Sequence, residues 1–306
     1  MTSHTLAETE AVSQAAPPRD SLELSMTLAM ALNKLPPLSP LVPKVLALRR
    51  DADAGITELA RVISSDPTLS ARMIGMANSA QFAGVHPLMR IQDALMRLGF
   101  VAACDMVVSV AVSRSLPTLP EFKPARRDLW LHSLAVGLCA REFARKMNAD
   151  CDPDAAYLAG FLHDIGYLAI ISLWPDMARK LIAHVTDPGR WEQPDYAKEQ
   201  GWPTHGALGG ELCKLWRLPD EIWLAIWDHD RLVTDNTTLC GLDAAIALAH
   251  RAVDGVLPLS NDVVWRPTHA LGTLLDVAGL APAVLDEVRS QLENQVERMA
   301  AVADSI

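Results

Sequence analysis

The sequence of 306 residues has few cysteines, and none of the five stands in a CxxC spacing. This argues against the disulfide framework of a small secreted protein, a zinc ribbon and a redox dithiol. Near residue 1 no basic segment is followed by an apolar one, so we predict no signal peptide. We therefore expect a protein of the reducing cytoplasm.

Basic residues are fewer than acidic ones: the chain has 27 Lys and Arg, 37 Asp and Glu, and a net charge of −10. Nucleic-acid binding depends on clustered Lys and Arg, so we expect no nucleic-acid partner. The apolar run 157–174 is long enough to span a membrane, but His163 and Asp164 lie near its centre. We predict a buried helix there and no membrane span.

The sequence lacks runs in which apolar and polar residues alternate, as they do in half-buried strands. Apolar residues recur instead at three- and four-residue spacing, and Asp66-Pro67 and Asp152-Pro153 each combine an N-cap with proline at the first helical position. These patterns predict an all-α fold.

The same spacing continues near the end of the sequence, where it predicts one further helix. Its apolar positions are Leu285, Val288, Leu292, Val296 and Met299. Such a helix could pack on its own domain or on a second copy of the chain, so a homodimer is one of the expected states.

Histidine is the residue type that indicates a functional site. Five of the nine histidines lie at or near predicted helices among apolar neighbours, and one of them, His163, forms a doublet with Asp164 in the middle of an apolar segment. The candidate metal ligands are His132, His163, Asp164, His205, His229 and His250. Imidazole nitrogens and carboxylates are the ligands of borderline divalent metals, so the set could hold one or two transition-metal ions.

Two interpretations without metal remain open for these residues. A histidine among apolar neighbours can be a core residue whose nitrogens are satisfied by hydrogen bonds. Asp164 could likewise accept a hydrogen bond from one histidine, which would make a buried polar pair.

His132 followed by His163-Asp164 resembles the HD superfamily of metal-dependent phosphohydrolases, in which a lone His, a His-Asp doublet and a later Asp bind the metal. The segments KLPPLSPLVPKVLAL, SDPTLSARMIGMANSA and IQDALMRLGF are more similar to the HDOD family, the HD-related output domain of bacterial signalling. This resemblance extends over about residues 25–300. It implies an HDOD-like helical bundle with an N-terminal helical subdomain and an HD-like subdomain.

Together with the composition, the resemblance predicts the domain limits. Residues 1–20, rich in Ala, Ser, Thr, Glu and Pro, are expected to form a disordered tail. The three prolines of residues 117–127 predict a linker between an N-terminal helical subdomain, 21–116, and an HD-like subdomain, 128–255. Residues 256–306 are then helices that close the domain.

The sequence departs from the enzyme pattern at two positions. His250 stands where the resemblance implies the last aspartate, and Tyr167 stands where related cyclic-dinucleotide phosphodiesterases have a lysine that could hold phosphate. We therefore expect a regulatory protein of bacterial signal transduction with a depleted metal site and no catalytic residue. It would bind a regulatory protein partner, a small molecule or a nucleotide. The alternative is a metal-dependent phosphohydrolase, a phosphodiesterase for a nucleotide second messenger, with His163 and Asp164 as central ligands.

Overall fold

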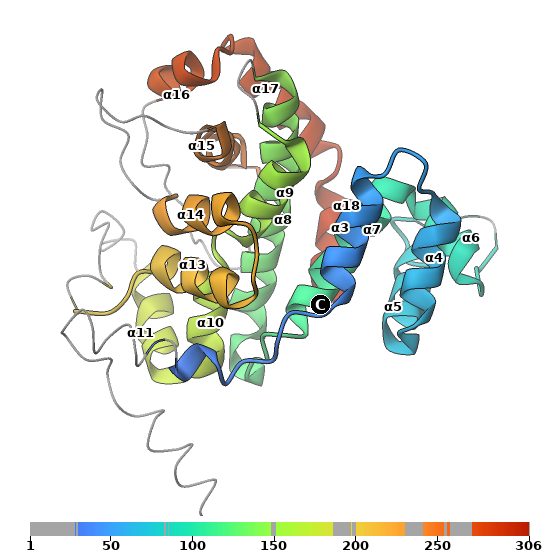
Figure 1. Cartoon of the computed structure of the whole chain (residues 1–306), viewed down its shortest axis with the longest axis horizontal. Coiled ribbons are helices and arrows are strands. Elements are labelled where there is room, and N and C mark those ends of the chain that lie inside the picture. Colours follow the sequence, from blue (N-terminus) through green and yellow to red (C-terminus); the bar gives the residue numbers. More distant parts are fainter. Residues whose placement is uncertain are drawn as a thin grey trace, which may run out of the picture. The chain divides into compact units, whose positions relative to one another are not determined.

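The computed structural model describes residues 30–82, 86–147, 151–185, 200–229 and 241–253, then 271–305, together with a few isolated positions. Every regular element in these ranges is a helix (Figure 1). This confirms the predicted all-α fold.

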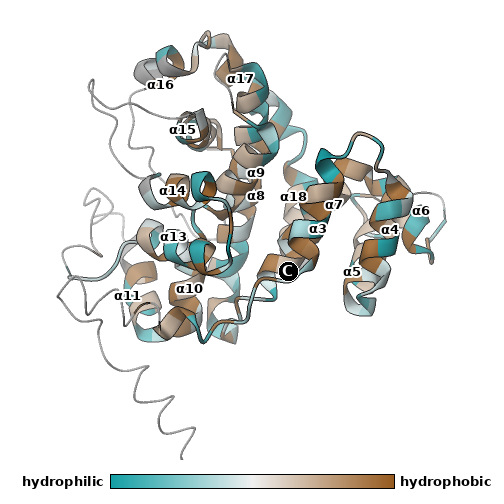
Figure 2. Cartoon of the chain, in the orientation of Figure 1, coloured by the Kyte–Doolittle hydropathy of each residue, from teal (hydrophilic) through white to brown (hydrophobic). Residues whose placement is uncertain are grey.

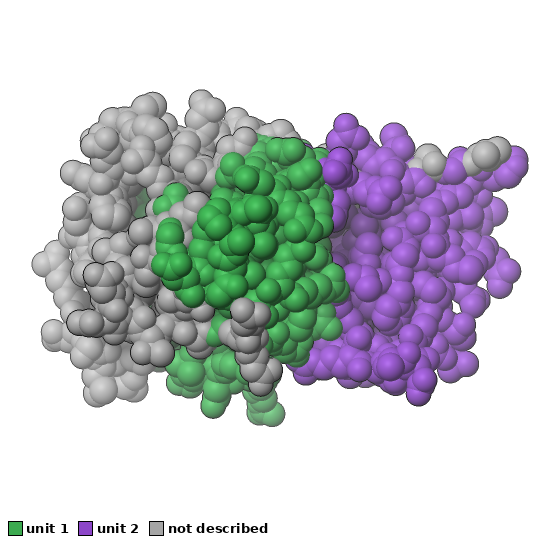
Figure 3. Space-filling view, turned by 90° about the horizontal axis from the view of Figure 1, so that it is seen from above, with its two compact units in different colours: residues 1–35, 118–293 green, residues 36–117, 294–306 purple. Residues whose placement is uncertain are grey.

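The chain divides into two compact units, and each unit is built from two separate stretches of sequence (Figure 3). Unit 1 comprises residues 1–35 and 118–293, and unit 2 comprises residues 36–117 and 294–306. The segment for which we predicted a linker, 117–127, contains the short 3-10 helix η1 (Pro120–Phe122) and the first turn of a long α-helix. The domain limits expected from the sequence stay a prediction.

Unit 2 is a group of short helices with one long buried helix at its centre. Its elements are α3 (Leu41–Arg50), α4 (Ile56–Ser64), α5 (Pro67–Ala77), α6 (Ile91–Leu98), α7 (Phe100–Ser113) and α18 (Val296–Ser305). The predicted N-cap is confirmed, because the Asp66 carboxylate accepts a hydrogen bond of 2.9 Å from the backbone N–H of Leu69. Helix α4 carries apolar and polar residues on opposite faces (Figure 2), and buries Leu59 and Ile63.

Unit 1 is assembled around its longest helix. Its elements are α8 (Lys123–Lys146), α9 (Pro153–Leu162), α10 (Ile165–Leu173), α11 (Pro175–Val185), α13 (His205–Leu215), α14 (Asp220–Asp228), α15 (Gly241–Val253), α16 (Leu271–Ala278) and α17 (Ala283–Glu293). Helix α8 packs on α9 and α15. It approaches α9 closely, because a Cβ added to Gly160 would lie only 3.1 Å from the Cα of Gly137.

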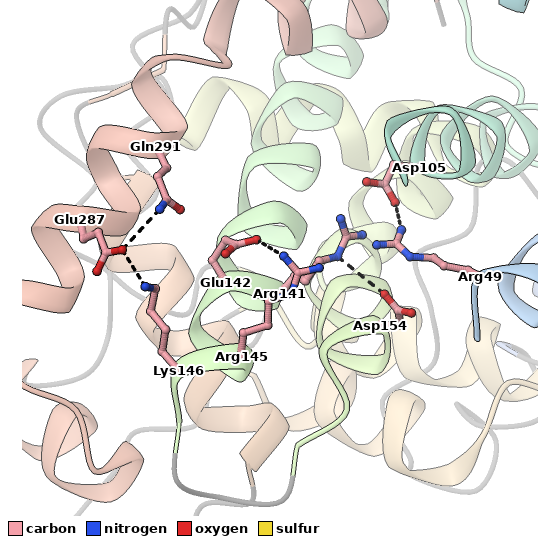
Figure 4. Close-up of polar contacts among 9 residues, drawn as sticks. All are labelled: Arg49, Asp105, Arg141, Glu142, Arg145, Lys146, Asp154, Glu287 and Gln291. Atoms are coloured by element: carbon pink, nitrogen blue, oxygen red, sulfur yellow. Dashed lines mark hydrogen bonds and ion pairs between the residues drawn. The ribbon is translucent and has the colours of Figure 1, made fainter. Parts of the chain in front are cut away.

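Ion pairs connect neighbouring helices within each unit (Figure 4). In unit 1, the Lys146 Nζ lies 2.7 Å from the Glu287 Oε1 and so links α8 to α17, while Arg141 and Asp154 link α8 to α9 at 3.8 Å. In unit 2, a buried ion pair joins Arg49 of α3 to Asp105 of α7.

The apolar segment around the His-Asp doublet is part of the core. By length and composition, Pro153–Leu173 could cross a membrane, as could the strongly bent pair α6 and α7 taken together. However, 83% of the most apolar window in Pro153–Leu173 is buried inside the protein, which is what a core helix requires. The segment is not one helix, since α9 ends at Leu162 and α10 begins at Ile165.

The prediction of one continuous helix from Leu285 to Met299 is wrong. The helix breaks at Asn294 and Gln295 into α17 and α18, which belong to different units. Helix α17 packs on α8 and α15, whereas α18 packs on α5. The periodic spacing was correctly recognised, but its two halves bury their apolar residues in two different cores.

Candidate metal centre

The structure brings all six candidate ligands together in unit 1. They come from the ends and middles of six helices, so the cluster lies where these helices meet. His132 lies within α8, His163 follows α9, Asp164 precedes α10, His205 begins α13, His229 follows α14 and His250 lies in the last turn of α15.

The His-Asp doublet occupies the turn between α9 and α10, which allows both side chains to face the same point. The Nδ1 of His163 donates a hydrogen bond of 2.6 Å to the carbonyl of Gly160, one of the carbonyls that a helix end leaves without an intrahelical partner. The Nδ1 of His229 likewise donates to the carbonyl of Ile226 at 2.6 Å. In the neutral rings, each Nε2 therefore carries the lone pair that a metal ligand needs.

The Asp164 carboxylate lies between two sets of histidines. Its Oδ2 is 3.1 Å from the Nε2 of His163 and 3.6 Å from that of His132. Its Oδ1 is 3.2 Å from the Nε2 of His205 and 3.5 Å from that of His229. Each oxygen of the carboxylate thus faces its own pair of histidines.

His250 completes the set on the Oδ2 side. Its ring centre lies 4.5 Å from that of His163 and 5.1 Å from that of His132, and donor atoms of the three rings lie within 4.8 Å of one another. We call His132, His163 and His250 with the Asp164 Oδ2 the first sub-site. We call His205 and His229 with the Asp164 Oδ1 the second sub-site. His250, which stands where the resemblance implied an aspartate, therefore lies beside His132 and His163 in the structure.

Several donor atoms of the cluster are buried without a hydrogen bond. His163 and Asp164 are 0% and 1% exposed. Within the described part of the chain, the Nε2 atoms of His163 and His250 and the Oδ2 of Asp164 have no hydrogen-bond partner. Buried polar atoms are rarely left so, and a lone pair 3.1 Å from a carboxylate oxygen is repelled unless a cation lies between them. The residues present therefore fit a divalent metal ion better than a purely hydrogen-bonded polar cluster.

The pKa values of the cluster favour the protonation states that metal binding needs. Burial, and secondarily the charge of His163, lowers the pKa of His132 to about 3. Burial, with His163 and His132, also lowers the pKa of His250 well below its ordinary value. Burial alone would raise the pKa of Asp164, but His163, His205 and His229 hold it well below its usual range. At neutral pH His132 and His250 are thus neutral imidazoles with a free lone pair, and Asp164 is an ionised carboxylate.

These shifts predict how stability depends on pH. We expect the free energy of unfolding of the metal-free protein to fall as the pH is lowered from about 7.5 to about 5. The unfolded chain protonates His132 and His250 near pH 6.5, while the folded chain does not, so the unfolded state binds more protons. Each residue contributes up to about 1.4 kcal/mol per pH unit below 6.5.

Urea unfolding at several pH values, with protein from which a chelator has removed any metal, measures this dependence. Asp164 does not contribute to it, because its lowered pKa acts only below the carboxyl's unfolded value of about 3.9. A His132→Gln variant should show a shallower slope. Equal stability at both ends of the range would contradict the buried neutral state of the two rings.

Sequence reasoning missed the contacts of two residues, Gly166 and Tyr167, that determine where His205 lies. A Cβ added to Gly166 would lie 1.9 Å from the carbonyl oxygen of His205, so only glycine allows α10 and α13 to approach this closely. The Tyr167 ring is stacked on the His205 ring, with centres 4.1 Å apart and planes 11° apart. Gly166, two residues after Asp164, was the only signal in the sequence for this contact.

Comparisons with known proteins agree with this architecture. A family model for the HDOD domain matches residues 35–232. A Marinobacter aquaeolei VT8 protein named for signal transduction is similar in structure, with a TM-score of 0.70, 22% identity, and coverage of 99% of this chain and 65% of that one. An HDOD domain protein of unknown function from Geobacter sulfurreducens has a TM-score of 0.64, 22% identity, and coverage of 94% and 99%. A Shewanella amazonensis SB2B protein named as a phosphohydrolase has a TM-score of 0.60, 22% identity, and coverage of 91% and 97%.

A curated relative matches this chain over a part of its own length. An uncharacterized protein of Treponema pallidum (strain Nichols) is 23% identical over 248 residues, which are 77% of this chain and 46% of that protein. The chain thus spans about half the length of this relative. At such identities, the solved structures show the fold alone. The family model matches more than half of the chain, and the chain therefore belongs to the HDOD domain family.

Proposed function

We propose that this HDOD protein works in cytoplasmic signal transduction by binding a regulatory protein partner or a small ligand such as a nucleotide. We further propose that its histidine–aspartate cluster holds divalent transition-metal ions that stabilise unit 1. The observation that carries the metal proposal is the contact of 3.1 Å between the Nε2 of His163 and the Oδ2 of Asp164, two buried atoms to which no described residue offers a hydrogen bond.

Each ligand has a distinct part in this proposal. His132, His163 and His250 would hold one ion together with the Asp164 Oδ2, and His205 and His229 would hold a second together with the Oδ1. A bound ion supplies positive charge and Lewis acidity. Because the ligands come from separate helices, their common attachment would contribute directly to the free energy of folding.

Two features support a binding role over catalysis. Among the described residues, the ionisable groups that most influence the pKa values of His132, Asp164 and His250 all belong to the cluster, and none is a Lys or Arg. Phosphoester hydrolysis needs such positive groups around the phosphoryl oxygens. His132, His163, Asp164 and His229 are also buried, which restricts the approach of a substrate.

The metal content of the purified protein tests the proposal. Protein purified without chelators or a metal-binding tag should contain about one or two ions per chain. Removal of these ions with a chelator should lower the melting temperature by more than about 5 °C, because the folded state loses a ligand that the unfolded state binds weakly. Metal-free protein whose melting temperature does not respond to added Zn²⁺, Mn²⁺ or Fe²⁺ would show that the cluster is a structural remnant.

A phosphohydrolase is the second candidate function. The observation that favours it is the Asp164 carboxylate, whose two oxygens face two sets of histidines as in two-metal hydrolytic sites. Metal-loaded protein should be assayed with bis(p-nitrophenyl) phosphate and with a cyclic dinucleotide. Under our proposal, hydrolysis does not exceed that of an Asp164→Asn variant. Turnover that this variant lacks would support the enzyme and overturn the non-catalytic role.

A further inference from the structure

His205 is the ligand of the second sub-site that lies nearest to solvent. Its side chain is 13% exposed, compared with 1% for His229 and 2% for Asp164. It is the first residue of α13, directly after Thr204, whose hydroxyl accepts a hydrogen bond of 3.2 Å from the N–H of Ala207. The position of the His205 ring therefore depends on what packs against it from the neighbouring helix.

The packing partner is the Tyr167 ring on α10. The two rings are nearly parallel, at 11°, with centres 4.1 Å apart, a geometry of close face-to-face contact. The phenol ring thus defines the plane in which the imidazole lies. In that plane the Nε2 of His205 is 3.2 Å from the Asp164 Oδ1 and 3.0 Å from the Nε2 of His229.

The backbones beneath these two rings are in direct contact. A Cβ on Gly166 would lie 1.9 Å from the carbonyl oxygen of His205, and a Cβ on Gly209 would lie 3.3 Å from the N atom of Gly166. The backbone of the first turn of α10 therefore lies close to the backbone of α13. Because Tyr167 is the next residue after Gly166, the position of its backbone relative to that of His205 is consequently fixed.

The contact between His205 and His229 shows why the ring orientation matters. The Nδ1 of His229 donates to the carbonyl of Ile226, so in the neutral ring its Nε2 is an acceptor. Without metal, the hydrogen between the two Nε2 atoms must come from His205. To bind an ion, His205 must instead present its Nε2 lone pair in the same direction, and a stacked neighbour keeps the ring in place for both states.

We propose that Tyr167 is the positioning residue of the second sub-site, and that its stack on His205 determines whether that sub-site binds a metal ion. This inference rests on the proposed metal centre. The first sub-site has its histidines on α8, α9 and α15, where His132, His163 and His250 contact one another edge to face. Loss of the Tyr167 ring therefore affects the second ion and leaves the first.

Two variants separate the ring from its hydroxyl. Tyr167→Phe keeps the stacked ring, and Tyr167→Leu replaces it with an apolar side chain that cannot stack. Equilibrium dialysis against Zn²⁺ with elemental analysis gives the number of ions per chain, and Co²⁺ titration followed by visible absorption reports the ligand geometry. Circular dichroism and thermal melting establish that each variant is folded.

We expect two ions in the wild-type protein and in Tyr167→Phe. In Tyr167→Leu the affinity for the second ion should fall by at least about tenfold, with the first ion and its Co²⁺ spectrum unchanged. Two ions bound equally well by folded Tyr167→Leu would overturn the inference, as would a Phe variant that behaves like the Leu variant or a folded Leu variant that loses both ions. A wild-type protein with one ion would leave the metal centre standing and overturn this inference. A wild-type protein that binds none would overturn the metal centre itself.

Discussion

Replacement of Asp164 by asparagine should remove most of the bound metal from the protein. Asp164 is the one carboxylate in the cluster, and its two oxygens lie within 3.6 Å of four histidine Nε2 atoms. Asparagine keeps the shape of the side chain but removes the negative charge that both sub-sites share. We expect at least about tenfold weaker binding of each ion, measured by dialysis and elemental analysis.

The matched control is Asp154→Asn. Asp154 lies in the first turn of α9, the helix that leads to His163, and is paired with Arg141 (Figure 4). This variant also removes one aspartate charge from unit 1, but it should retain the metal content of the wild type. If Asp164→Asn kept its metal while folded, Asp164 would not be a ligand, and the histidines alone would have to account for binding.

Replacement of Gly166 by alanine should destabilise the protein more than any surface substitution. The new Cβ would lie 1.9 Å from the oxygen and 2.7 Å from the carbon of the His205 carbonyl, and backbone atoms cannot move aside as a flexible side chain can. The start of α13 must shift, so we expect a loss of about 3 kcal/mol or more in the free energy of unfolding. Urea unfolding measures this loss. Because His205 moves with the helix, the second ion should also bind more weakly.

Gly75 offers a control for the same chemical change. It lies in α5, and a Cβ added there would have no atom within 4 Å. Gly75→Ala should therefore be neutral or stabilise the protein by up to about 1 kcal/mol, because alanine favours the helix. If both alanine variants had the same stability, α10 and α13 would not be as close as the structure has them.

Those parts of the fold that depend on neighbouring residues could be predicted from the sequence. Asp66 and Asp152 each cap the helix that follows, because an N-cap and a proline at the next position are local signals. The break between α17 and α18 was missed because it depends on distant partners. Nothing at Asn294 and Gln295 resembles a strong stop signal, and the two helices separate because one packs on α8 and the other on α5.

The members of the candidate site were predictable by residue type, but their arrangement was not. Histidines among apolar residues and a doublet with aspartate indicated a common site, and the structure brings all of them together. The sequence did not reveal that the chain turns at His163 and Asp164, because the segment reads as one continuous apolar helix. The position of the Asp164 carboxylate between two sets of histidines follows from that turn, as does the contact of Gly166 with His205.

The position of α18 has a consequence for the order in which the protein is made. Helix α18 buries Met299, Val302 and Ala303 and packs on α5, in the unit that otherwise consists of residues 36–117. During translation, α3 to α7 leave the ribosome early, whereas α18 follows only after the whole of unit 1 has been synthesised. For most of that time the nascent chain lacks the helix that covers part of α5. Helices α3 to α7 are thus translated early but belong to the unit that is completed last, and the growing chain must keep an apolar surface from aggregating until then.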